Sequence, residues 1–136
     1  TTQYLIMSAA SSGSQTTANV STTKLYFTPS TGTLSATNYD SLSDTNLKTN
    51  VNIISNAVDT LSLINGVEYE WCDTGNKSAG VIAQNIESIL PHLVNTSSQE
   101  YKSVNYNGLI GYLIEAIKEQ QIQINTLKDE IRKING

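Results

Sequence analysis

The chain has 136 residues, enough for one ordinary domain or for a small domain with an appended segment. Eight Lys and Arg residues against twelve Asp and Glu residues give a formal net charge of −4, and no basic stripe interrupts this balance, so nucleic acid and anionic membrane surfaces are not expected as partners. No apolar run approaches the length of a membrane span, which argues against a membrane protein.

The first 43 residues are rich in Ser and Thr and poor in large apolar side chains. Gln3–Met7, Lys24–Phe27 and Thr33–Thr37 have the composition of short strands, and Pro29–Gly32 reads as a turn. So few apolar groups cannot offset the entropy of ordering this segment within one chain. It is therefore either disordered or β-structure completed by other copies of itself. Its content of Thr, Tyr, Val and Phe favours the second interpretation.

The pattern changes after residue 46. Apolar residues recur with a 4-3-4-3 spacing, which predicts a helix over residues 47–61 on the positions Leu47, Val51, Ile54, Val58 and Leu61. Asn65-Gly66 is expected to end this helix and to turn the chain.

Strict alternation over Val67–Trp71 predicts a strand with one face toward a core. Residues 73–77 read as a hairpin loop, Gly80–Ala83 as the returning strand, and residues 84–90 as a short helix that Pro91 ends. Two further short strands are expected at 93–94 and 101–104. The predicted core is centred on Trp71, Tyr69, Val81, Ile82, Ile86 and Leu90.

A long helix is predicted from Asn105 or Asn107, either of which can cap it, nearly to the end of the chain. Its apolar residues recur every 3.5 positions over three heptads, which is typical of an oligomeric coiled coil. The predicted seam within residues 106–134 has isoleucine at every a position and mixed residues at d: Ile110, Leu113, Ile117, Gln120, Ile124, Leu127, Ile131 and Ile134. This pattern indicates association and leaves the number of strands open.

Cys72 and His92 are the only cysteine and the only histidine. One cysteine cannot form an internal disulfide, and its place beside Trp71 predicts a small buried hydrophobe rather than a nucleophile. A lone histidine makes a catalytic triad or a histidine-rich metal site improbable, so His92 is expected to serve packing. The sequence predicts neither a metal site nor a cofactor.

Ser43, Asp44 and Lys48 form the remaining candidate site. Taken locally, Ser43 or Asp44 is expected only to cap a helix, with Lys48 as a solvated residue of its first turn. The alternative is a serine nucleophile with a lysine base. Residues five apart do not share a face of a helix or a strand, so this alternative needs a sharp bend at 44–46 or a lysine from a neighbouring chain. It also needs burial, beside residues such as Leu47 and Val51, that lowers a lysine pKa from about 10.4.

These stretches, in this order, resemble the C-terminal intramolecular chaperone domain of bacteriophage tail spikes and tail fibres. This domain is also called the S74 peptidase domain and occurs in endosialidases and neck appendage proteins. The preceding residues 26–34 are similar to the shaft repeat that often precedes such a domain. The matching stretches are Ser43-Asp44 with Lys48, residues 67–71, residues 80–86, residues 90–94 and residues 106–127.

The resemblance implies an α+β fold with residues 1–43 as the end of a trimeric β-structured shaft and residues 44–136 as a chaperone that trimerises and then releases itself. It implies cleavage between Ser43 and Asp44, with Ser43 as the nucleophile and Lys48 as the general base. Some members carry asparagine where this chain has Asp44. The implied partners are two further copies of the chain and the shaft of the same polypeptide. The shaft would join the virion tail, and the chaperone would act in the host cytoplasm.

Two other interpretations remain open from the sequence. A tail-fibre tip that binds a host surface and never cleaves would use exposed Tyr and Asn loops as its binding site. A coiled-coil adaptor with no viral role would leave the Ser/Thr-rich segment without an explanation. Fragments ending at residue 43 would favour self-cleavage, and an intact chain would favour the tip.

Overall fold

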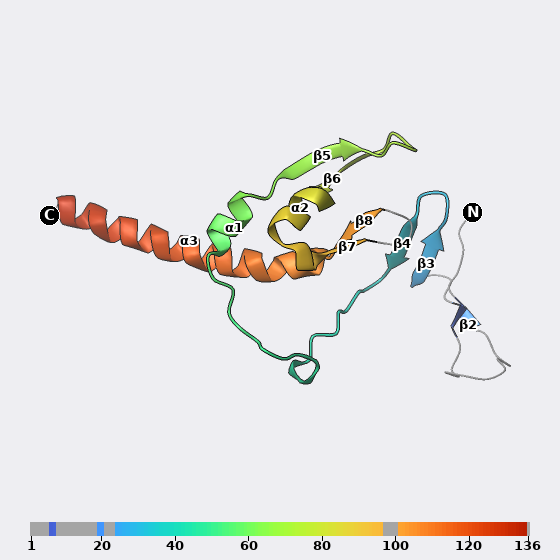
Figure 1. Ribbon diagram of the computed structural model, residues 1–136, viewed down its shortest axis with the longest axis horizontal. Coiled ribbons are helices and arrows are strands. Elements are labelled where there is room, and N and C mark those ends of the chain that lie inside the picture. The colour runs from blue at the N-terminus through green and yellow to red at the C-terminus, as the bar shows by residue number, and fades with distance from the viewer. Residues whose placement is uncertain (1–5, 8–18, 21–23, 97–100, 136) are drawn as a thin grey trace. The chain divides into compact units, whose positions relative to one another are not determined.

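The computed structural model describes residues 6–7, 19–20, 24–96 and 101–135 (Figure 1). The chain divides into two compact units, Thr1–Asn50 and Val51–Gly136. Within the described residues, short antiparallel strand pairs and helices are followed by one long helix, which confirms the predicted α+β class. None of the helices in this part of the chain combines the length and the apolarity needed to cross a membrane.

The described residues of the first unit form two antiparallel strand pairs. Strand β1 (Ile6–Met7) pairs with β2 (Asn19–Val20), and β3 (Leu25–Thr28) pairs with β4 (Thr33–Ala36). The last two strands confirm the prediction for this segment. The expected strand at 3–7 is described only at its last two residues, and most of the polar stretch at 8–24 lies outside the described residues.

The predicted helix over residues 47–61 is wrong. A 3-10 turn, η1, covers only Thr45–Leu47, and the helix α1 begins at Ala57 and ends at Ser62. Asn50 and Asn56 have φ angles of 53° and 54°, in the left-handed region that a right-handed helix excludes. The apolar spacing that suggested one helix therefore spans a turn, an extended segment and a short helix.

The predicted β-hairpin is confirmed. Strand β5 (Gly66–Glu70) pairs antiparallel with β6 (Lys77–Val81), and Gly75 in the connecting loop has a φ of 70°. Trp71 does not join the core: it is 54% exposed and packs edge-on against Tyr69, with 5.4 Å between the ring centroids. Cys72 beside it is also exposed, so the prediction that it is buried is wrong as well.

The core of the second unit lies where a short helix, a 3-10 turn and a strand pair meet the long helix. These are α2 (Ala83–Ile89), η2 (Pro91–Leu93), β7 (Val94–Thr96) paired with β8 (Lys102–Val104), and α3 (Tyr106–Asn135). The buried cluster consists of Ile86, Leu90, Leu93 and Leu109, with Ile64, Val81, Ile89, Val94, Val104 and Tyr112 packed against it. The predicted core members Val81, Ile86 and Leu90 are confirmed, Tyr69 is half-buried, and Ile82 is exposed.

Helix α3 starts where Asn105 caps it: the Asn105 Oδ1 accepts a hydrogen bond from the Gly108 N–H, at 3.3 Å. Gly108 allows the first turn to touch Leu93, because a Cβ at this position would lie 2.3 Å from the Leu93 Cδ2. The N-terminal half of α3 carries α1 and the core elements, and its C-terminal half extends without neighbouring elements of the second unit (Figure 1).

Candidate functional site

The turn around η1 provides the bend that a Ser43–Lys48 contact requires. Asp44 caps the turn, since its Oδ1 accepts a hydrogen bond of 2.7 Å from the Asn46 N–H. The Lys48 N–H closes the turn on the Thr45 carbonyl oxygen at 3.1 Å. The capping role considered for Asp44 is therefore present, but it serves a single 3-10 turn that folds the chain back rather than the first turn of a long helix.

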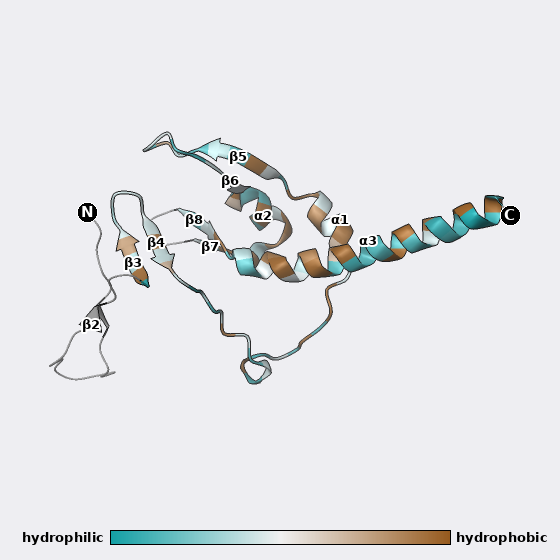
Figure 2. Ribbon diagram, turned by 180° about the vertical axis from the view of Figure 1, so that it is seen from behind, coloured by the Kyte–Doolittle hydropathy of each residue, from teal (hydrophilic) through white to brown (hydrophobic). Residues whose placement is uncertain are grey.

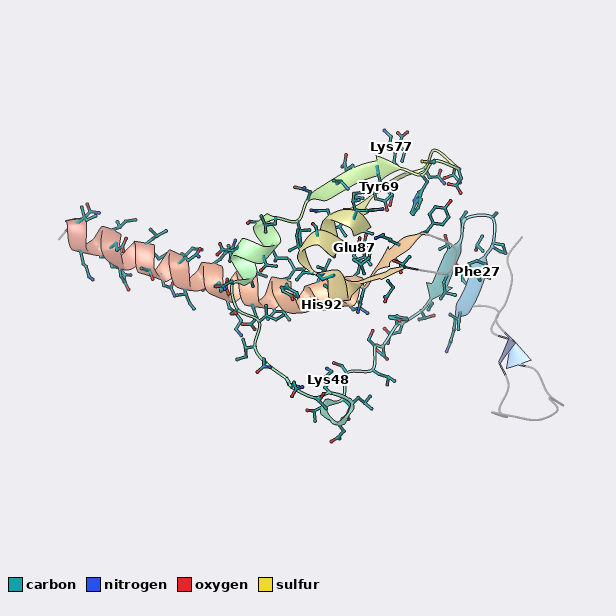
Figure 3. All side chains as sticks on the ribbon, in the orientation of Figure 1. Phe27, Lys48, Tyr69, Lys77, Glu87 and His92 are labelled. Carbon is teal, nitrogen blue, oxygen red and sulfur yellow. The ribbon has the colours of Figure 1, made fainter. Side chains whose placement is uncertain are left out.

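The Lys48 side chain folds back onto Ser43. Its Nζ donates hydrogen bonds to the Ser43 Oγ, at 2.5 Å, and to the Ser43 carbonyl oxygen, at 3.0 Å. Figure 3 labels Lys48 at this turn. A deprotonated Lys48 amine in the same place could accept the hydroxyl proton of Ser43 while one of its N–H groups still donates to the carbonyl oxygen.

In the single chain, both members of this pair are exposed to solvent. Ser43 and Lys48 are exposed, and Leu47 and Val51, which were expected to bury the lysine, are 68% and 72% exposed. Leu42 is also exposed. Any desolvation of the Lys48 amine must therefore come from something other than the described residues of the same chain.

Helix α3 has two different faces. Leu109 and Ala116 are buried against the chain's own domain. The apolar a and d residues are 45–83% exposed and form a stripe that continues past the domain, visible as brown patches along the helix (Figure 2). The predicted seam residues and the residues that pack on the domain thus lie on different faces of α3, and the described residues of the chain leave the predicted seam exposed.

The other candidates form no site. The ring of His92 lies beside Tyr112, with 6.4 Å between centroids, and this contact fits the predicted packing role. The described residues include no group of three or more His, Cys, Asp or Glu side chains that could hold a metal ion.

One polar contact on α3 escaped prediction. The carboxylate of Glu119 accepts hydrogen bonds from the backbone N–H groups of Ala57 and Val58, at 3.0 and 2.9 Å. These bonds, first that of Val58, hold the pKa of the Glu119 carboxyl below its ordinary value. Sequence spacing gave no signal for this contact, because it joins positions more than 60 residues apart.

Part of the chain matches a known protein family. Residues 43–95 match the family described as chaperone of endosialidase, and the match begins at Ser43. The resemblance stated from the sequence is therefore confirmed for this segment.

The chain is also similar to long tail fiber proteins. It shares 33% identity over 103 residues with long tail fiber protein Gp37 of Salmonella phage S16, covering 68% of this chain and 14% of that protein. It is 29% identical over 98 residues to Gp37 of Enterobacteria phage K3, covering 65% of this chain and 8% of that protein. It is 37% identical over 87 residues to Gp37 of Escherichia phage AR1, covering 57% of this chain and 8% of that protein. The chain thus spans only a small part of the length of these relatives.

Proposed function

We propose, from the premise that residues 43–95 belong to the chaperone of endosialidase family, that this chain is the intramolecular chaperone of a bacteriophage tail fibre. The observation that carries the proposal is the exposed apolar seam of α3, which extends beyond a domain that is already folded around its own core. Similarity to long tail fiber proteins supports a fibre as the client of the chaperone.

The seam is proposed to assemble three parallel chains. A row of half-exposed isoleucine and leucine side chains is stabilised when it is removed from water, so the seam favours association. The heptad pattern does not determine how many helices associate, since Gln120 interrupts the simple pattern at a d position. The family resemblance supports a homotrimer.

Residues 1–43 are proposed to be the end of a β-structured shaft, and residues 44–136 the chaperone. The hairpin β3–β4 leaves Leu34 more than half exposed, which is consistent with strands that complete their packing with other copies. Strands from three chains lose much entropy before their mutual contacts form. A domain that trimerises first would raise their local concentration and set their register.

Self-cleavage is proposed to follow assembly, with Ser43 as the nucleophile and Lys48 as the base. The hydrogen bond between the Lys48 Nζ and the Ser43 Oγ supports this pairing. The hydroxyl attacks a peptide carbonyl, its proton passes through Lys48 to the departing amine, and water then hydrolyses the resulting ester. Release of the chaperone would leave the shaft kinetically trapped. The shaft would remain in the virion tail, and the chaperone would have acted in the host cytoplasm.

The origin of the hydroxyl determines which bond breaks. Attack by Ser43 on its own carbonyl would close a strained four-membered ring, whereas attack on the carbonyl of Leu42 closes a five-membered ring. Cleavage between Ser43 and Asp44 therefore requires the hydroxyl of a partner subunit. The Lys48 contact with the Ser43 carbonyl oxygen supports the Ser43–Asp44 bond, and the family match that begins at Ser43 supports the bond before it.

Intact mass of the purified chain after incubation tests this proposal. Products 1–43 and 44–136 indicate attack between subunits, and products 1–42 and 43–136 indicate attack within one chain. Ser43→Ala and Lys48→Arg should both stay in one piece, since a guanidinium keeps its proton and cannot act as a base. Ser41→Ala is the matched control and should be cut like the wild type. A wild-type chain that remains intact as a trimer would overturn self-cleavage and favour a permanent fibre tip.

A further inference from the structure

We infer that Gln120 fixes the register in which α3 helices of different copies align; this inference rests on the proposed assembly through the seam. Gln120 is exposed on α3 at a d position, and it is the only polar residue among the a and d positions of the seam. The seam residues on either side of it, Ile117 and Ile124, are exposed as well. The described residues therefore leave uncovered a row of apolar side chains with a single amide within it.

The apolar part of the seam does not distinguish one alignment from another. Isoleucine occupies every a position, so a copy shifted by one heptad, about 10 Å along the helix, again places isoleucine against isoleucine over the remaining overlap. The charges beside the seam do not favour the unshifted alignment either. In register, Lys128 at an e position faces the uncharged Gln123 at a g position of the next copy, whereas a shift of one heptad brings it to Glu130.

The Gln120 amide does distinguish the alignments. In a parallel, unshifted assembly the Gln120 side chains of all copies lie in one layer, where the amide N–H groups of one copy can donate to the amide oxygen of the next. In a shifted copy, Gln120 lies level with Leu113 or Leu127 of the other copies, which offer no hydrogen bond. A buried amide without a partner is costly, so a single polar residue in an apolar seam selects one alignment at some cost in stability.

The place of Gln120 along α3 gives this selection a structural consequence. Leu109 and Ala116 are the buried residues of α3, and Leu109 belongs to the core cluster of the second unit. Gln120 follows Ala116 by about one turn of the same helix. Because each domain is packed on its own α3, helices that align in register carry their copies of this domain at the same level, and a shifted helix carries its domain about 10 Å out of level.

Disulfide crosslinking measures the alignment directly. The test uses the full-length chain with Ser43→Ala and Cys72→Ser, because Cys72 is exposed and would form crosslinks of its own. One pool of chains carries Leu127→Cys and a second pool carries Ile134→Cys; the pools are mixed in urea, refolded together and equilibrated in a glutathione redox buffer. In register, position 127 links only to 127 and position 134 only to 134, since cysteines one heptad apart are too distant for a disulfide. A mixed link between 127 and 134 reports a shift.

With Gln120 in place, mixed links should form a small share of all crosslinks. Gln120→Leu should raise that share at least about tenfold, because a shifted alignment then leaves no amide unpaired. It should also keep the oligomer assembled at lower protein concentration, since the polar layer weakens the seam. Gln123→Leu is the matched control: it makes the same change outside the a and d positions and should keep the original share. Leu113→Gln combined with Gln120→Leu restores one polar layer and should bring the share back down.

The outcomes separate this inference from the proposed function. An unchanged share of mixed links in Gln120→Leu overturns the role of Gln120 while assembly through the seam stands. Mixed links as frequent as random pairing in the chain that keeps Gln120 overturn it as well. If that chain sediments as a monomer, assembly through the seam is wrong and the inference falls with it. If Gln120→Leu precipitates, Gln120→Ala removes the amide without adding apolar bulk, and an unchanged share in that variant overturns the inference.

Discussion

Ile86 is the only large side chain among the described residues that is fully buried, so its truncation tests the core most directly. Ile86→Ala removes three carbon atoms, worth about 0.8 kcal/mol each for burial alone, or about 2.4 kcal/mol. The cavity left between α2 and its neighbours adds about 1 kcal/mol, and the better helix propensity of alanine returns about 0.5 kcal/mol. The expected loss in free energy of unfolding is therefore about 3 kcal/mol.

Urea denaturation of the Ser43→Ala chain, followed by far-UV circular dichroism at one protein concentration, measures this loss without interference from cleavage or mass action. With a slope of about 1.5 kcal/mol per M, the midpoint should fall by about 2 M. Ile86→Val provides a graded control and should cost about 1 kcal/mol. A loss below about 1 kcal/mol for Ile86→Ala would refute the placement of this side chain at the centre of the core.

Two further predictions concern α3. Gly108→Ala should lower the free energy of unfolding by about 1 kcal/mol in the same assay, because the added Cβ collides with Leu93 even though alanine favours a helix. Gly66→Ala is the control, since its added Cβ has no atom within 4 Å and should lack that collision. Glu119 should make a pH-dependent contribution to the free energy of unfolding, because the pKa of its carboxyl in the folded state lies below the ordinary value of 4.5. The contribution is present above pH 4.5 and is lost as the pH falls through the lowered pKa of the folded state. The midpoint difference between the wild type and Glu119→Gln should shrink over that acidic range, and a difference independent of pH would refute the contact.

The sequence predicted the elements whose pattern is local. The hairpin at β5 and β6, the short helix α2, the strand pair β7–β8 and the long helix α3 all follow from alternation, turn residues and caps within a few positions. The apolar a and d positions of α3 were predicted from their heptad spacing, and these residues are exposed in the structure.

Two of the failed predictions are the helix over residues 47–61 and the burial of Trp71 in the core. The first depends on backbone conformation, and the second depends on what packs against one face of a strand. The stripe over 47–61 had helical spacing, but Asn50 and Asn56 adopt left-handed conformations that interrupt it, and asparagine is among the residues that do so most readily. Trp71 continued the inward alternation of β5, yet it lies just past a two-stranded hairpin, and the described residues leave it 54% exposed. Alternation identifies one face of a strand and does not show what that face contacts.

The candidate site was predictable in part. The local pattern of Ser43 and Lys48 favoured a helix cap, and the family resemblance singled them out as a nucleophile and a base. The need for a bend between them, or for a lysine from a neighbouring chain, could be derived from helix and strand geometry. The cap by Asp44 and the turn over 45–47 provide that bend. The contact of Glu119 with α1 could not be anticipated, because it depends on how two distant helices pack.

The cleavage rate of Ile124→Asp measures whether assembly of the seam gates self-cleavage. Ile124 lies on the exposed seam beyond the part of α3 that packs on the domain, so a charge there should prevent assembly and leave the domain folded. Thr126→Asp places the same charge two positions away, off the seam, and should assemble and cleave like the wild type. We expect Ile124→Asp to sediment as a monomer and to stay uncut. Efficient cleavage of that monomer would show that assembly does not gate the reaction.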